Sequence, residues 1–480
     1  MNDLGLIDMN DVLVMKFGGT SMGSAERIRV AARISAEQHA KRPVVTVVSA
    51  MSKVTDLILD TLRKAEVGDQ ADLDNNLKRL HDRHREACRE LLPADRQEDA
   101  LAGVAAVISD LSRIAKGMMM LGECPPRSID EALAVGERLS ALMLAQYLES
   151  TGIRAVAVNA ADLIATDAVF GNATPLMAPT RERCGTIVTP MLEAHVLPVV
   201  TGFNGSTEDG RPTTLGRGGS DFSASIIAAA LDASELWIWT DVDGIMTGDP
   251  RLVKDARVLE EVTYSEAAEL AYNGAKVLHP RTLAPLVERK IPVWSKNSFA
   301  PEKPGTRIVP HIDVARGPHA VTSMADVALV SIEPANSVLS GTKVMARALE
   351  ALARTNVELL AITSSSYRQN FCFLVRKSEL ERATESLEED FSIELAHGYV
   401  KPIQADSHVG LIAVVGEGMR GTPGLAGRIF TAISQQQINI IAIAQGSSEL
   451  TIAIVVHRDG LERAVQAIHS ECGLGEKVAK

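Results

Sequence analysis

The segment Lys16–Ser21 places a lysine and two adjacent glycines directly after a short run of apolar, strand-like residues. Gly18 and Gly19 let backbone amides come close to a polyanion, and a helical pattern from Ser24 would point the positive end of a helix dipole the same way. Lys16 adds a full positive charge. The P-loop patterns GxxxxGKS and GxxxxGKT are absent. We therefore predict a nucleotide-phosphate site of another type, with a simple packing turn as the alternative.

A second glycine-rich segment, Thr213–Asp221, surrounds Arg217 with three glycines and leads into a helical pattern. Ser220 or Asp221 could simply cap that helix, which would explain one residue of the segment. An arginine held among glycines near a helix N-terminus is also well suited to a bidentate contact with a carboxylate or a phosphate. We predict that this segment binds an anionic ligand.

Acidic residues follow the next strand-like run, in the sequence TDVDGIMTGDPR at 240–251. In an open α/β sheet, ligands bind to the loops beyond the carboxyl ends of the strands. The acids fit a solvated turn as well as a magnesium site. Because Mg²⁺ commonly keeps its waters and binds substrate phosphates, we predict no metal site made by the protein alone.

The elements that must position these segments alternate between strand and helix over about the first 300 residues. This pattern predicts an α/β layered domain with a largely parallel central sheet. A charge-rich helical stretch at about 55–122 predicts an inserted helical subdomain, and the proline-rich stretch 301–318 predicts a linker. Strand-like runs fall at 12–16, 44–48, 155–158, 196–200 and 236–239.

The last third of the chain repeats itself. Leu359–Ile362 matches Ile440–Ile443, and Leu380–Ala383 matches Leu461–Ala464 at the same offset. Each copy follows the order strand, helix, strand, strand, helix, which predicts two similar α+β modules. A duplication of this kind serves either oligomerisation or the sensing of a ligand. We place a first domain at 1–310 and the two modules at 321–402 and 403–480.

The composition is that of a large globular chain with aliphatic cores: 480 residues, 46% hydrophobic and only 4% aromatic. A formal net charge of −12 offers no positive field to a phosphate backbone, so we expect no nucleic-acid partner. The five cysteines form no CxxC pair, which fits a reducing cytoplasm. The acidic N-terminus and the lack of a long apolar run predict neither a signal peptide nor a membrane span. We therefore expect a cytoplasmic protein.

Six motifs, taken together, resemble those of the aspartate kinases, which belong to the amino-acid kinase family. The resemblance covers nearly the whole chain, because aspartate kinases also carry paired C-terminal ACT modules of the βαββαβ kind. The order and spacing of the motifs are more specific than any one of them. They are KFGGTS at 16–21, VVSAMSKVTD at 47–56, VGERLS at 135–140, TTLGRGGSD at 213–221, TDVDGIMTGDPR at 240–251 and NGAKVLHPRT at 273–282.

The resemblance implies transfer of the ATP γ-phosphoryl group to the side-chain carboxylate of L-aspartate. An aspartate carboxylate is already ionised at pH 7, so this nucleophile needs no general base. By motif match, Lys16 and Asp221 are catalytic, with Asp221 holding Lys16, and Mg²⁺ is held mainly by the nucleotide phosphates. The substrate residues are Ser49, Thr55, Glu137 for the α-ammonium and Arg217 for a carboxylate. The nucleotide-side residues are Lys16, Gly18, Gly19, Ser21, Thr240, Asp241, Met246, Arg251 and Lys276.

Two positions depart from the family pattern or leave alternatives open. Met246 stands where many family members have a tyrosine near the adenine, so a softer apolar contact replaces stacking there. Without the motif, the helical pattern around Glu137 favours an acid on a helix surface.

The C-terminal modules are expected to sense an amino acid. QGSSE at 445–449 resembles the effector motif of amino-acid-sensing modules, and Ser364 occupies the matching position of the first copy. We predict that Ser364, Asn439 and Gln445 bind an inhibitory effector, lysine or threonine, and that the modules join subunits into a homodimer or homotetramer. The predicted enzyme then catalyses the first step towards lysine, threonine and methionine. A glutamine satisfied inside the sheet is the alternative for Gln445.

Three other functions share part of this sequence pattern. A kinase for glutamate or N-acetylglutamate would share the phosphate loops, although Glu137, placed for an ammonium, argues against the acetylated substrate. A silent sensor would not need intact Lys16, Arg217 and Asp221. A kinase fused to homoserine dehydrogenase is not expected within these 480 residues, because the kinase-like domain and the two modules leave no room for a dehydrogenase.

Overall fold

The computed structural model describes residues 9–275, 278–313, 317–335, 340–365 and 370–475. They form two compact units. The first unit consists of Met1–Ile245, Glu260–Tyr264 and Leu278–His311, and the second of Met246–Leu259, Ser265–Val277 and Ile312–Lys480.

The first unit is built on an eight-stranded sheet with the order β3-β5-β2-β1-β8-β10-β11-β9. All of its pairings are parallel except that of β10 with β11, so the predicted largely parallel sheet is confirmed. The strands are β1 (Leu13–Phe17), β2 (Val44–Val48), β3 (Ala155–Val158), β5 (Leu197–Thr201), β8 (Glu235–Thr240), β9 (Glu261–Thr263), β10 (Val293–Asn297) and β11 (Thr306–Val309).

The topology of this sheet places a ligand crevice beside β1. The chain leaves β1 towards β2 on one side and later returns as β8 on the other side. At such a switch point, the loops beyond the carboxyl ends of the two strands diverge and leave room for a ligand.

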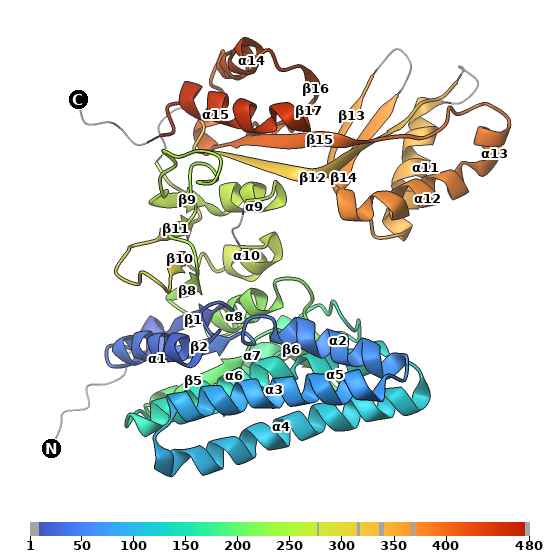
Figure 1. The fold of residues 1–480 in the computed structure, drawn as a ribbon. Coiled ribbons are helices and arrows are strands. Elements are labelled where there is room, and N and C mark those ends of the chain that lie inside the picture. Colours follow the sequence, from blue (N-terminus) through green and yellow to red (C-terminus); the bar gives the residue numbers. More distant parts are fainter. Residues whose placement is uncertain (1–8, 276–277, 314–316, 336–339, 366–369, 476–480) are drawn as a thin grey trace. The chain divides into compact units, whose positions relative to one another are not determined.

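Helices cover both faces of the sheet. One face packs against α1 (Ala25–His39) and α6 (Val135–Ser150), and this aliphatic core continues into α2 (Val54–Glu66), α3 (Gln70–Leu91) and α4 (Ala94–Leu121). Figure 1 shows α2, α3 and α4 running alongside one another, within the stretch predicted as helical. The other helices of the unit are α5 (Pro126–Leu133), α7 (Met177–Glu193), α8 (Gly219–Ala230) and α10 (Pro280–Val287).

Two local features complete the first unit. A small sheet of β4 (Ala165–Thr166), β6 (Asn204–Thr207) and β7 (Pro212–Thr214) carries the chain into the glycine-rich segment. The predicted linker 301–318 is wrong in part, because its residues Thr306–Val309 form β11 and pair with β10 and β9. Its prolines 304 and 310 flank that strand rather than exclude it.

The second unit contains a six-stranded antiparallel sheet with the order β13-β14-β12-β15-β17-β16. Two helix pairs build separate aliphatic cores on it, with α9 (Tyr264–Tyr272) as a further helix that begins at the edge of the unit. The elements are β12 (Ala320–Ile332), α11 (Gly341–Arg354), β13 (Leu359–Ser364), β14 (Phe371–Arg376), α12 (Leu380–Asp390), α13 (Ser392–Ala396), β15 (Gln404–Val415), α14 (Leu425–Gln435), β16 (Ile440–Gln445), β17 (Thr451–His457) and α15 (Leu461–Glu471).

The two repeats share their central strands. Residues 320–324 of β12 pair only with β15, whereas residues 327–332 also pair with β14. In the same way, β15 pairs with β17 only from Val409 onward. Each α+β module therefore takes its fourth strand from the other copy, and the proposed boundary between 402 and 403 divides the sequence but not the sheet.

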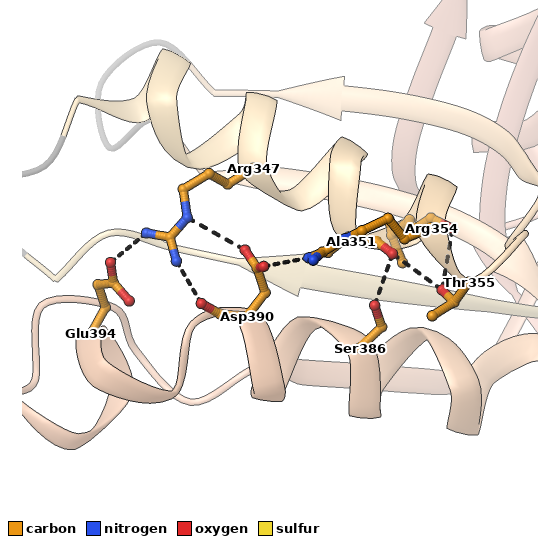
Figure 2. A network of polar contacts seen from close by, with 8 residues as sticks. Arg347, Ala351, Arg354, Thr355, Ser386, Asp390 and Glu394 are labelled. Atoms are coloured by element: carbon orange, nitrogen blue, oxygen red, sulfur yellow. Dashed lines mark hydrogen bonds and ion pairs between the residues drawn. The ribbon is translucent and has the colours of Figure 1, made fainter.

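The helices of the first repeat are fixed to each other by a polar network, shown in Figure 2. The Arg347 side chain donates to Glu394 and to the backbone oxygen of Asp390, and Arg354 forms an ion pair with the Asp390 carboxylate. Ser386 donates to the backbone of Ala351 at 2.8 Å. These contacts hold α11 against α12 and α13.

Among the described residues, no helix combines the length and the apolar character needed to cross a bilayer.

Candidate active site

Lys16 lies at the carboxyl end of β1 and points towards α8. Strand alternation requires this direction, because Met15 and Phe17 enter the aliphatic core on the α1 and α6 face. The Lys16 ammonium lies 2.5 Å from Asp221 Oδ1, and the lysine is only 7% exposed. A Cβ atom at Gly18 would lie 3.5 Å from the Lys16 Nζ atom. The lysine charge is therefore held directly over the glycine turn.

The glycine-rich segment forms the start of α8 without a side-chain cap. The N-cap residue is Gly218, with φ of 70°, and it makes no side-chain cap to the first turn. Capping by Ser220 or Asp221, the alternative explanation of this segment, is therefore wrong, because both residues lie inside the first turn. The Gly219 amide donates to the Gly216 backbone oxygen at 2.9 Å, which leaves the amides of Ser220 and Asp221 for an anion. Arg217 is exposed directly before them and makes no hydrogen bond or ion pair within the described parts of the chain.

Glu137 is buried at the start of α6. A Cβ atom at Gly136 would lie only 2.6 Å from the Ala50 Cβ atom, so the glycine lets the first turn of α6 pack against the loop after β2. Glu137 is 4% exposed, and its Oε2 atom has no hydrogen-bond partner in the described residues. Burial raises the pKa of Glu137 to about 7, although neighbouring amides and the Lys16 charge favour the ionised form. The helix-surface interpretation is therefore wrong.

Asp130, on α5, is a site residue that the sequence did not reveal. It is 1% exposed, and its Oδ2 atom accepts from the Gly171 amide at 2.8 Å and from the Thr214 amide at 2.9 Å. The Thr214 hydroxyl donates to Asp130 Oδ1 at 2.7 Å. Burial raises the pKa of this carboxyl. Asp130 thus anchors the strand that leads into the segment containing Arg217.

These residues surround one cavity of about 610 Å³ in the first unit. It brings together seven predicted site residues: Lys16, Gly19, Ser49, Thr55, Glu137, Arg217 and Asp221. Residues that the sequence did not single out also line it, including Lys53, Asp56, Asp130, Phe203 and Ser220. A buried acid and exposed cations thus face one space, which suits a ligand that carries both an ammonium and carboxylates.

Four predicted nucleotide residues lie at the carboxyl ends of β1 and β8, outside the lining of this cavity: Gly18, Ser21, Thr240 and Asp241. The Gly18 amide donates to the Trp239 backbone at 3.1 Å, which joins the two strand ends. Ser21 is buried, and its hydroxyl lies 2.7 Å from the Ser298 hydroxyl, which donates to the Thr240 backbone at 3.1 Å.

Arg27 and Ser298 also lie near the carboxyl ends of these strands, although no motif in the sequence identified them as site residues. Arg27 donates to the Ser298 hydroxyl at 3.1 Å and stacks 3.6 Å from the ring centre of Phe299. The first turn of α1 is thereby tied to the carboxyl end of β10. A local motif search could not find these contacts, because the two residues are far apart in the chain.

Two further nucleotide-side predictions, Met246 and Arg251, fall in the second unit. Met246 forms a β-bridge with Val258, and the exposed Arg251 forms an ion pair with Asp249 at 2.5 Å. Lys276 lies outside the described residues. Within the described ranges, no group of three or more His, Cys, Asp or Glu side chains is arranged to hold a metal ion.

A second cavity, of about 500 Å³, lies in the second unit between the two edge strands β13 and β16. Ser364 and Gln445 line it, together with Glu269 and Asn273 from α9. Gln445 is exposed, so the alternative of a glutamine buried in the sheet is wrong. Asn439, the third predicted effector residue, precedes β16 and is not part of this lining.

Comparison with known proteins identifies families for both the first domain and the C-terminal modules. The model of the amino acid kinase family matches residues 11–297, and an ACT domain model matches 337–391 and 412–472. A bifunctional aspartokinase/homoserine dehydrogenase of Arabidopsis thaliana is 35% identical over 95% of this chain, which spans 50% of that relative. Aspartokinase 3 of the same plant, a chloroplastic protein, is 32% identical over 95% of this chain and 81% of its own.

A solved structure adds the fold. The structure of E. coli aspartokinase III in complex with aspartate and ADP has a TM-score of 0.80 and 28% identity, covering 96% of this chain and 99% of that one. The same enzyme in complex with lysine and aspartate has a TM-score of 0.79. Although the chain spans only about half the length of the bifunctional relatives, the resemblance inferred from the six motifs is confirmed. The chain belongs to the amino acid kinase family, among the aspartokinases that carry ACT domains.

Proposed function

We propose that this protein is an aspartate kinase, which transfers the γ-phosphoryl group of ATP to the side-chain carboxylate of L-aspartate. The observation that carries the proposal is the buried Glu137 Oε2 atom, which has no hydrogen-bond partner in the described residues of a cavity that Arg217 also lines. A buried carboxylate needs a cationic partner when it ionises. The α-ammonium of an amino acid supplies one, whereas an acetylated amine does not.

Substrate recognition follows from the charges of the cavity. Glu137 binds the ammonium, and the Arg217 guanidinium grips a carboxylate with two parallel hydrogen bonds. Ser49 and Thr55 donate hydroxyl hydrogen bonds from the loop after β2 and the first turn of α2. Asp130 keeps the Arg217 segment in place through the amide and hydroxyl of Thr214.

Phosphoryl transfer needs positioning and charge neutralisation more than proton transfer, because the attacking carboxylate is already ionised. Lys16 neutralises charge on the transferred group, and Asp221 holds the lysine at 2.5 Å. The uncapped first turn of α8 adds backbone amides to the same region.

ATP binds at the carboxyl ends of β1 and β8 in this proposal. Gly18, Gly19 and Ser21 approach its phosphates, and Thr240 and Asp241 lie on the nucleoside side. Met246, Arg251 and Lys276 complete the set by family resemblance alone. Mg²⁺ is carried mainly by the nucleotide phosphates, because Mg²⁺ commonly keeps its waters and binds substrate phosphates.

Regulation is proposed for the second unit. An amino acid of the pathway, lysine or threonine, binds in the cavity that contains Ser364 and Gln445 and inhibits the kinase. Asn439, directly before β16, is a further effector residue in this proposal. The edge strands β13 and β16 end the sheet on both sides and suit pairing between subunits, as a homodimer or homotetramer. The product then enters the route to lysine, threonine and methionine, in the cytoplasm.

A substrate panel tests the proposed activity. ADP release is followed with L-aspartate, L-glutamate and N-acetyl-L-glutamate at equal concentration, with Lys16→Ala as the control for contaminating kinases. We expect ADP release above the control only with L-aspartate. Faster release with glutamate or N-acetylglutamate would assign the cavity to a different acidic substrate.

A further inference from the structure

Lys53 occupies a backbone conformation that a lysine rarely adopts. It is the N-cap residue of α2, with φ of 64° and ψ of 5° in the left-handed region, where a Cβ atom costs free energy that glycine avoids. Its backbone oxygen accepts from the Leu57 amide at 3.2 Å, so the conformation is fixed by the start of the helix. Residues in this conformation are enriched at active sites and ligand-binding sites.

The Lys53 side chain lines the cavity that also contains Glu137 and Arg217. Lys53 is exposed and lines the 610 Å³ cavity, and its side chain makes no hydrogen bond or ion pair in the part of the chain that the structure describes. The other lysine of the lining, Lys16, is already paired with Asp221. Arg217 and Lys53 are therefore the two cations of the lining without an anionic partner among the described residues.

The charges of an acidic amino acid match this arrangement. L-Aspartate carries one ammonium and two carboxylates, and Glu137 takes the ammonium in the proposed function. Of the other acids in the lining, Asp130 is saturated by amides and a hydroxyl, and the exposed Asp56 lies in the first turn of α2, where the helix dipole favours its charge. One carboxylate of the substrate is left for a cation besides Arg217.

We propose that Lys53 is a second substrate-binding cation, which holds the carboxylate of L-aspartate that Arg217 does not hold. This inference rests on the proposed aspartate kinase function. Lys53 thereby selects a dicarboxylic amino acid over one with a single carboxylate. Its left-handed backbone keeps the ammonium at the rim of the cavity without a competing partner in the described residues.

Two matched glycine substitutions test the proposal. Lys53→Gly removes the charge and relieves the backbone. Lys290→Gly makes the same exchange at another exposed lysine with positive φ, 55°, which lies after α10 and outside the cavity lining. We expect Lys53→Gly to raise the KM for aspartate about tenfold, the usual effect of losing one charge-assisted hydrogen bond, with the KM for ATP unchanged. Lys290→Gly should leave both constants at the wild-type values.

Salt adds a readout that a purely structural role would not change. Added NaCl should raise the KM for aspartate more steeply in wild type and Lys53→Arg than in Lys53→Gly, because one screened ion pair is missing from the glycine variant. An unchanged KM for aspartate in Lys53→Gly, or a rise confined to the KM for ATP, would overturn the proposal for Lys53 alone. Failure of the wild type to turn over aspartate would instead overturn the proposed function.

Discussion

We expect the buried Glu137 to make the affinity for aspartate depend on pH near neutrality. Burial raises its pKa from 4.5 to about 7, so in the free protein it gains a proton as the pH falls through 7. Only the ionised carboxylate can bind the substrate ammonium strongly. At pH 6 about one tenth of the groups are ionised, so the KM for aspartate should rise about tenfold between pH 8 and pH 6.

The same pKa makes Glu137 costly to the free protein. In the unfolded chain the carboxyl loses its proton at a lower pH than in the folded protein, so stability falls as the pH rises from 4.5 to about 7. A pKa raised from 4.5 to about 7 corresponds to about 3 kcal/mol of lost stability above pH 7. Glu137→Gln should recover much of this free energy while it weakens aspartate binding.

The assay combines kinetics with unfolding. The KM values for aspartate and ATP are measured from pH 6 to pH 8.5 for wild type and Glu137→Gln, and urea unfolding of both is followed at pH 8. We expect the pH dependence of the aspartate KM to be present in wild type and absent from Glu137→Gln. A flat profile in wild type, or a less stable Glu137→Gln protein at pH 8, would refute the role assigned to the buried carboxylate.

Four other variants probe the remaining parts of the site. Lys16→Ala should lower the turnover number about a hundredfold, since one electrostatic donor is lost from the transition state, and near-normal turnover would contradict the phosphate site. Arg217→Lys keeps the charge but loses the planar fork, so the KM for aspartate should rise and that for ATP should not. Asp130→Ala leaves the Thr214 amide unpaired and should lower the free energy of unfolding by about 1–3 kcal/mol while raising the aspartate KM. Gln445→Ala should shift the inhibition curve for lysine or threonine to higher concentration with uninhibited turnover preserved, and an unshifted curve would remove Gln445 from the effector site.

Features with a local cause could be predicted from the sequence. The strand, the glycine turn and the helix around Lys16 lie within a short stretch, and each of them follows from residue type and spacing. The parallel sheet follows in the same way from apolar runs buried on both faces. The repeated modules were visible because their strands and helices recur in the same order.

Features that depend on distant partners could not be predicted. Asp130 is a site residue only because Gly171 and Thr214, far along the chain, come to lie beside it. Glu137 has the pattern of a surface acid, and its burial results from the close approach of Gly136 to Ala50. The exchange of β12 and β15 between the modules also depends on pairings that no repeat in the sequence reveals.

Trapping of the product shows whether the phosphoryl group is transferred to the side-chain carboxylate of aspartate. The protein is incubated with ATP, Mg²⁺ and L-aspartate in the presence of hydroxylamine, and the aspartyl hydroxamate is measured beside the ADP released. An acyl phosphate on the side-chain carboxylate reacts with hydroxylamine, so we expect hydroxamate in proportion to ADP, and about a hundredfold slower formation of both products with Lys16→Ala. ADP released with aspartate but without hydroxamate would show that the phosphoryl group does not go to the carboxylate, and would rule out the proposed aspartate kinase reaction.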